Sequence, residues 1–213
     1  MNDDAQGRVW HPEVITSSTE QTLHHLSTAS LLSDFYLAGG TGLALQLGHR
    51  ISEDLDFFTK NLFDEDALIQ RIQRMPDFSV VAKAPATLHA NIQGTKVSFL
   101  GYAFPMLFPL ARFLEVGIAD TGDIACMKIS AIASRGTKRD FVDLYASAQR
   151  WGLAELLRLF DRKYAQTAYS KIHILKSLTF FEDAEKDPMP HLLTPIDWGE
   201  VKRFFLREIP HLP

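Results

Sequence analysis

The sequence predicts an α+β (α/β) fold, with a mixed β-sheet flanked by helices in the first half and a bundle of helices in the second. Short apolar or alternating runs, which are typical of strands, recur between residues 35 and 118. Helical periodicity dominates from Gly122 onward. We therefore expect a sheet core with an N-terminal helix over residues 1–119 and a helical half over residues 120–213. Because no flexible linker separates them, the two halves are expected to pack together and to complete one site.

The first elements are predicted from leucine spacing and from glycine stops. Leucines at positions 23, 26, 31 and 32, with polar residues between them, predict an amphipathic helix over 19–33. The apolar run 35–38 stops at Gly39-Gly40 and predicts a buried strand. Good helix formers followed by another glycine then predict a helix over 41–48.

The later elements follow the same two periodicities. Alternation predicts a strand over 54–58, and leucine and isoleucine at 68, 69 and 72 predict a helix over 63–75. Strands are expected over 78–83, 87–92 and 96–102, with Gln93-Gly94 as the hairpin turn between the last two, and one more strand over 112–118. In the second half, helices are expected over 124–134, 138–151, 153–164, 170–181 and 194–208.

Composition limits the class of protein. The chain has 213 residues and a net charge of -4, which argues against binding nucleic acid with its whole surface but leaves room for a local basic patch. The single cysteine, Cys126, excludes an intramolecular disulfide and predicts a cytoplasmic protein. No stretch reaches ~18 uninterrupted apolar residues, and the segment 1–10 lacks the apolar core of a signal peptide. We therefore expect no membrane association.

Gly39, Gly40 and Thr41 separate a predicted strand from a predicted helix. Paired glycines let the backbone approach a ligand closely, and the first turn of a helix presents unpaired N–H groups and a partial positive charge. This combination suits an anionic phosphate. A plain strand-to-helix turn is the other interpretation, because such turns are common.

Asp54 and Asp56 are two apart on a predicted strand, so their carboxylates emerge on the same face. Two like charges so placed repel each other, and a bound divalent cation removes the repulsion. Because Mg²⁺ prefers carboxylate oxygens, we predict a Mg²⁺ (or Mn²⁺) site at this pair. The alternative places Asp54 in a turn and makes Asp56 a cap, but the flanking Leu55, Phe57 and Phe58 disfavour a solvated turn.

A second block supplies cations. Lys128 is the only cation in the apolar run 124–133, so its ammonium must either reach water or meet an anion. Arg135, Lys138 and Arg139 gather positive charge beside it, which suits phosphates or an RNA backbone. An ordinary solvated loop is the alternative for these three residues.

The two blocks together resemble the nucleotidyltransferase superfamily, and more narrowly the AbiEii/AbiGii-type nucleotidyltransferase toxins of bacterial toxin–antitoxin and phage-abortive systems. The first block is Gly-Gly-Thr followed, after one helix, by Arg-x-Ser-x-Asp-Leu-Asp-Phe-Phe at 50–58. The second is a helix with a lone lysine and then Arg-Gly-Thr-Lys-Arg-Asp-Phe-Val-Asp-Leu-Tyr at 135–145. The resemblance covers about residues 35–151 and implies a nucleotidyltransferase fold.

The resemblance also implies roles for single residues. It makes Asp54 and Asp56 the metal ligands, lets Lys128 neutralise a triphosphate, and gives Asp140 a functional role. Asp143 lies three residues further on the same helical face, and its alternative role is to hold Lys138, Arg139 or the helix start. The residues alone do not separate the two carboxylates. The proposed phosphate-binding residues are Gly39, Gly40, Thr41, Arg50, Ser52, Arg135, Lys138 and Arg139.

One position departs from the pattern of the superfamily. Many nucleotidyltransferases carry a third carboxylate on a later strand, where it helps deprotonate the attacking hydroxyl, and the corresponding position here is Ser98. Serine is a poor general base and a weak metal ligand. Either Asp140 supplies the missing carboxylate, or the enzyme is impaired.

The function implied by the resemblance is Mg²⁺-dependent transfer of a nucleoside monophosphate from a nucleoside triphosphate to an acceptor. The resemblance suggests an RNA acceptor, such as the 3′ end of a tRNA, and a toxic activity that a partner antitoxin restrains. Two alternatives remain from the residues: an enzyme that nucleotidylates a protein side chain, and a degenerate nucleotide-binding or antitoxin-binding module without catalysis.

Overall fold

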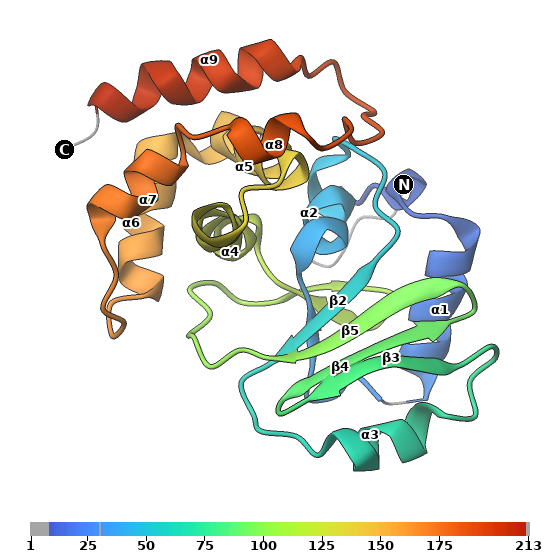
Figure 1. The fold of residues 1–213 in the computed structure, drawn as a ribbon. Helices are drawn as coiled ribbons and strands as arrows, with labels where there is room; N and C mark the ends of the chain where they lie inside the picture. Colours follow the sequence, from blue (N-terminus) through green and yellow to red (C-terminus); the bar gives the residue numbers. More distant parts are fainter. Residues whose placement is uncertain (1–8, 30, 212–213) are drawn as a thin grey trace.

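The computed structural model describes residues 9–29 and 31–211. Most of the segment 1–10, for which no signal peptide is expected, lies outside these residues. In the described part of the chain, seven strands form one mixed sheet in the order β3-β4-β5-β2-β1-β7-β6 (Figure 1). The strands are β1 (Tyr36–Leu37), β2 (Leu55–Thr59), β3 (Ser79–Ala84), β4 (Thr87–Ile92), β5 (Thr95–Gly101), β6 (Ala111–Phe113) and β7 (Val116–Ile118).

The strand directions make the sheet mixed, as the sequence predicts. The central strand β2 pairs antiparallel with β1 and parallel with β5, and β1 pairs parallel with β7. The outer neighbours, β3 with β4, β4 with β5 and β6 with β7, are antiparallel. The expected turn at Gln93-Gly94 is confirmed: both residues have positive φ, and Ile92 pairs with Thr95 across it.

Helices cover both faces of the sheet. On one face, α1 (Ser17–Thr28) and α3 (Glu65–Ile72) contribute leucines to a core that includes Leu55 and Phe57 of β2. On the other face lie α2 (Gly39–Leu47) and α4 (Thr121–Ser134), whose Leu43 and Ile124 pack with Tyr36 and Phe58. The two sides of β2 therefore face different surroundings, and Asp56 is on the side of α2 and α4.

The remaining helices form an arch beyond α4 (Figure 1). Their apolar residues join those of α4 in a second core, in which Phe141 and Phe205 are fully buried. These elements are α5 (Lys138–Trp151), α6 (Leu153–Lys163), α7 (Lys171–Ser177), α8 (Glu182–Glu185) and α9 (Trp198–Glu208), and short 3-10 turns lie at Pro12–Val14 and Ile209–His211. Within the described residues, no helix has both the length and the apolar character needed to cross a membrane.

Several predicted boundaries were wrong, for local reasons. The strand expected over 112–118 is a hairpin, β6 and β7, because Leu114 and Glu115 take positive φ and reverse the chain. The helix expected over 170–181 ends at Ser177, and α8 begins after a turn. The helix expected over 194–208 begins at Trp198, because the Asp197 side chain accepts a hydrogen bond from Glu200 N and caps it.

The first helix also ends earlier than expected. α1 ends at Thr28, so the leucines at 31 and 32 pack into the core from a turn and not from the helix. Its start is defined by Thr16, whose hydroxyl accepts from Thr19 N. Residue 30, within the predicted range 19–33, lies outside the described residues.

A buried ion pair links the helices to the loop that follows β5. Lys163 Nζ lies 2.7 Å from Asp123 Oδ1, and both side chains are fully buried. The same ammonium donates to Pro105 O, and the Asp123 carboxylate accepts from the backbone N–H groups of Leu107 and Phe108. Because each buried charge has several partners, α4, α6 and this loop are held together.

Candidate active site

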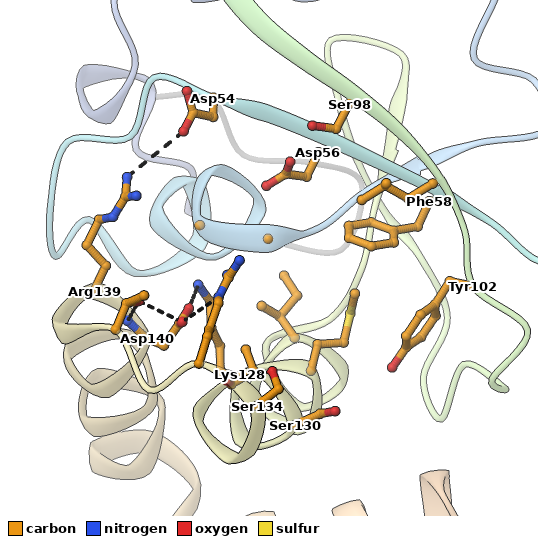
Figure 2. Close-up of a pocket in the computed structure, with 18 of the residues that line it drawn as sticks. Asp54, Asp56, Phe58, Ser98, Tyr102, Lys128, Ser130, Ser134, Arg139 and Asp140 are labelled. Carbon is orange, nitrogen blue, oxygen red and sulfur yellow. Dashed lines mark hydrogen bonds and ion pairs between the residues drawn. The ribbon is translucent and has the colours of Figure 1, made fainter. Parts of the chain in front are cut away.

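A cavity of about 550 Å³ lies between the sheet and the helices α4 and α5 (Figure 2). One end is polar and contains carboxylates, guanidinium groups and an ammonium group. The other end is apolar and aromatic. The residues that line it include Gly39, Gly40, Arg50, Ser52, Asp54, Asp56, Phe58, His89, Ser98, Tyr102, Lys128, Arg135, Arg139, Asp140 and Tyr164.

Asp56 reaches the polar end from β2, and Asp54 reaches it from the position just before β2. The predicted alternation holds, since Leu55 and Phe57 are completely buried on the opposite side of the strand. Burial raises the pKa of Asp56, and hydrogen bonding from the Ser98 hydroxyl and the charge of Lys128 only partly offset this effect. An ionised Asp56 is therefore costly in the protein alone, and a bound cation would remove that cost.

Gly39 and Gly40 permit this arrangement because they have no side chains. Gly39 has a φ of +60°, and a Cβ placed on it would lie 2.6 Å from Asp56 Oδ2. A Cβ on Gly40 would lie 2.3 Å from Arg50 Nη2. The two glycines form the first turn of α2 and not a separate turn before it, so the partially positive helix N-terminus lies at the cavity wall.

Thr41 stands behind this wall. Its side chain is buried and its hydroxyl donates to the backbone carbonyl of Asp54, with Ser52 Oγ also in hydrogen-bonding contact at 2.9 Å. Thr41 does not line the cavity, whereas Ser52 does. The contact of Thr41 instead supports the chain segment that presents Asp54.

Asp143 is the centre of a buried charge cluster. Arg50 donates to it from Nε and Nη2, at 2.7 and 2.9 Å, and Lys128 Nζ lies 2.6 Å from its Oδ2. His49 Nε2 is 2.8 Å from its Oδ1. Burial acts to raise the pKa of Asp143, but Lys128 and Arg50 outweigh it and hold the pKa well below the ordinary value. The cluster joins α5 to α4 and to the chain that follows α2.

Asp140 lies one helical turn earlier and, unlike Asp143, faces the cavity. Lys128 donates to its Oδ1 at 2.9 Å, and Arg135 and Thr137 donate to its Oδ2 at 3.2 and 2.7 Å (Figure 2). The structure therefore separates the two carboxylates that the sequence left unresolved. Asp143 is enclosed in the core, whereas Asp140 holds two cations at the cavity surface.

The ammonium of Lys128 already has two anionic partners in the protein. Burial acts to lower its pKa, but the carboxylates of Asp143 and Asp140 outweigh this and raise it, so the lysine is charged. The guanidinium of Arg50 is similarly engaged, since Nη1 donates to Ile51 O while the other donors reach Asp143. Both residues line the cavity, but their geometry is set by neighbouring protein groups.

Arg139 and Lys138, the other two predicted phosphate-binding cations, differ in burial and in position relative to the cavity. Arg139 is exposed, and its Nη1 lies 3.9 Å from Asp54 Oδ2 across the mouth of the cavity. Lys138 is buried and lies outside the cavity, contrary to the expected phosphate contact: its ammonium donates to Asp187 O and lies 5.3 Å from the Trp198 ring centroid.

Sequence reasoning missed the aromatic end and His89. Phe58 and Tyr102 meet edge to face at 5.6 Å between centroids, and the hydroxyls of Tyr102 and Tyr164 are 2.5 Å apart. His89 Nδ1 lies 3.1 Å from Ser98 Oγ. A signal for His89 was present, because a two-residue turn at 93–94 sets the register that pairs His89 with Ser98.

The donor set fits Mg²⁺ held together with a substrate. Within the described residues, no group of three or more His, Cys, Asp or Glu side chains is placed to hold a metal. Mg²⁺ commonly takes one or two carboxylates, several waters and the phosphates of its nucleotide. Asp54 and Asp56 supply such a pair, and the cations opposite them suit the phosphates.

Solved structures with a similar fold are nucleotidyltransferases. The chain is similar to the nucleotidyltransferase toxin MenT4 from Mycobacterium tuberculosis H37Rv, with 17% identity, a TM-score of 0.54, and coverage of 93% of this chain and 87% of that one. It is also similar to ANT(2″)-Ia in complex with adenylyl-2″-tobramycin, with 12% identity, a TM-score of 0.52, and coverage of 70% and 99%. The fold is therefore that of a nucleotidyltransferase.

Sequence comparison identifies the family. The model described as "Nucleotidyl transferase AbiEii toxin, Type IV TA system" matches residues 21–107 and 94–212. An uncharacterized protein of Aquifex aeolicus (strain VF5) is 37% identical over 195 residues, which is 89% of this chain and 93% of the relative. The chain belongs to the AbiEii family of nucleotidyltransferase toxins of type IV toxin–antitoxin systems, which confirms the resemblance seen in its motifs.

Proposed function

We propose that this nucleotidyltransferase moves a nucleoside monophosphate from a Mg²⁺-bound (or Mn²⁺-bound) nucleoside triphosphate to a hydroxyl group of RNA. One observation carries the proposal. Asp54 and Asp56 face Lys128, Arg135 and Arg139 across a single cavity, so that ligands for a cation and partners for phosphates converge. Residues of the sheet core and residues of α4 and α5 line the cavity together. This arrangement supports a division of the chain into two halves near residue 120.

The residues have separate tasks in this reaction. The metal, held by Asp54 and Asp56, supplies charge stabilisation at the transferred phosphoryl group and at the leaving pyrophosphate. Lys128 contacts the triphosphate, and Asp140 and Asp143 hold its ammonium in place. Arg135, oriented by Asp140, adds a second cation. Preformed cations of this kind stabilise developing charge without reorganising during the reaction.

The aromatic end of the cavity suits the nucleobase. Phe58, Tyr102 and Tyr164 line it, and Figure 2 places Phe58 beside Asp56. A base stacked on such a wall keeps its triphosphate directed to the polar end, because the two ends belong to the same cavity. Base–aromatic stacking contributes about 1–3 kcal/mol and tolerates different bases.

The RNA acceptor is supported by a second hollow next to the cavity. It shares Ser134 and Arg135 with the cavity and continues over His173, Lys176 and the exposed ring of Phe180. Single-stranded nucleic acid is bound by cations placed along its phosphate backbone and by aromatic rings on which its bases stack. The hollow therefore suits a single strand such as the 3′ end of a tRNA. Two cations along this hollow, Arg135 and Lys176, are compatible with the net charge of -4.

The family context supports a toxic activity. Because the family consists of type IV toxins, we propose that a cognate antitoxin restrains the enzyme. Its substrates, nucleoside triphosphates and RNA, are those of the cytoplasm, which is the compartment proposed for it. Two results are expected of such a toxin. The isolated protein incorporates labelled nucleotide into RNA, and its expression arrests growth.

The test uses the purified full chain with each of the four α-³²P-labelled nucleoside triphosphates, Mg²⁺, and either total tRNA or a protein extract. We expect label in the RNA fraction, lost when the metal is chelated. Label only in protein would replace the RNA acceptor by an amino-acid side chain. Absence of label from both fractions, with nucleotide still bound, would contradict the proposed catalysis.

A further inference from the structure

The position that corresponds to the usual third carboxylate is occupied by Ser98, and serine is a poor general base. Ser98 of β5 pairs directly with Asp56 of β2, so it lies beside the proposed metal ligands. Among the described residues that line the cavity, the carboxylates are Asp54, Asp56 and Asp140. The first two are engaged by the proposed cation, and Asp140 already accepts from Lys128, Arg135 and Thr137.

A histidine completes a row across the sheet at this point. Asp56, Ser98 and His89 occupy paired positions on the neighbouring strands β2, β5 and β4. Leu88 and Ala90 are buried on the opposite face of β4, so His89 lies on the cavity side and lines the cavity. Its Nδ1 is 3.1 Å from Ser98 Oγ.

The contact with Ser98 orients the ring of His89. Nδ1 is the ring nitrogen that lies 3.1 Å from Ser98 Oγ, and a serine hydroxyl can donate or accept there, depending on the tautomer of the ring. In the tautomer that carries its hydrogen on Nδ1, the ring donates to Ser98 Oγ and Nε2 holds the lone pair. A general base at Nε2 requires this tautomer.

We propose that His89 Nε2 is the general base that deprotonates the acceptor hydroxyl, with Ser98 as the residue that positions the ring. This role rests on the proposed function. As the acceptor O–H bond breaks, its oxygen forms a bond to the α-phosphorus, and the bond from that phosphorus to the β-phosphate oxygen breaks. The proton resides on Nε2 as an imidazolium, the electron pair leaves with pyrophosphate, and water takes the proton from the ring afterwards.

The decisive variant is His89→Asn. Its amide nitrogen can donate to Ser98 as Nδ1 does, but it has no basic nitrogen. A purely structural role predicts near-normal activity for His89→Asn, whereas a base predicts a loss of about 10²–10⁴-fold in kcat. The KM for the nucleoside triphosphate should stay within about twofold, because binding does not require the base. His24→Ala, an exposed histidine of α1, is the matched control.

A second measurement is chemical rescue. Imidazole added to His89→Ala should restore part of the transfer, and it should not stimulate Asp56→Asn. The inference is overturned if His89→Asn turns over within about threefold of the unaltered enzyme, or if imidazole restores nothing to His89→Ala. A failure of the unaltered enzyme to transfer to any acceptor would overturn the proposed function itself, which distinguishes the two results.

Discussion

The Asp56 carboxylate lies directly against the backbone of Gly39. A Cβ at Gly39 would lie 2.6 Å from Asp56 Oδ2, closer than real contacts allow, so the carboxylate has its place only because residue 39 lacks a side chain. The proposed metal ligand is thus positioned by the first turn of α2 as well as by its own strand.

Gly39→Ala should therefore impair transfer. The methyl group displaces the carboxylate, and a misplacement of about 1 Å costs on the order of 100-fold in rate. The positive φ adds about 1–2 kcal/mol of strain. Gly94→Ala is the control, since Gly94 also has a positive φ but has no atom within 4 Å of its added Cβ. Equal transfer rates in the two variants would contradict the role of Gly39.

Asp143→Asn should destabilise the fold strongly. The variant leaves Lys128 and Arg50 buried without their shared carboxylate, and breaking such a buried pair costs about 3–5 kcal/mol. Urea denaturation measures the change in the free energy of unfolding. Asp66→Asn removes the exposed partner of Lys83 and should cost less than about 1 kcal/mol. If the two variants lose the same stability, Asp143 does not organise the cluster.

The same carboxylate predicts how stability depends on pH. The pKa of Asp143 is far below its ordinary value of 3.8 in the folded protein, and that of Asp140 is also lowered. Their contribution is therefore fully present above the unfolded pKa and is lost as pH falls through the folded pKa. Between pH 5 and 2, the free energy of unfolding should fall more steeply for the unaltered protein than for Asp143→Asn. Parallel curves would contradict this assignment.

Phe58→Ala should weaken nucleotide binding. Loss of a stacking wall worth about 1–3 kcal/mol raises the Kd for a nucleoside triphosphate by roughly 5- to 150-fold. Isothermal titration with a non-hydrolysable analogue and Mg²⁺ gives the value. Phe180→Ala, which removes an exposed ring outside the cavity, should leave this Kd unchanged. An unchanged Kd in Phe58→Ala would place the base elsewhere.

Local patterns predicted the sheet and most of the helices because they reflect local chemistry. The alternation around Asp56 and the turn at Gln93-Gly94 are properties of short segments, and both are confirmed. The break between α7 and α8 was missed, since helical periodicity continues through it.

Long-range contacts account for what the sequence did not predict about the site. Nothing near Asp143 indicates that its partners are Arg50 and His49, more than 90 residues earlier in the chain. Lys138 was assigned to phosphate because of its basic neighbours, but Asp187, from the loop after α8, binds it instead. The roles of such residues depend on packing that no local pattern contains.

The most direct test of the central claim compares Asp56→Asn with the unaltered protein in nucleotidyl transfer and in thermal melting without metal. Because burial raises the pKa of Asp56, removing its charge at pH 7 should leave the metal-free melting temperature unchanged or higher. Transfer should fall by at least about 100-fold, since the metal that stabilises the transition-state charge loses a ligand. An Asp56→Asn protein that melts normally and transfers at the unaltered rate would contradict the proposed metal site.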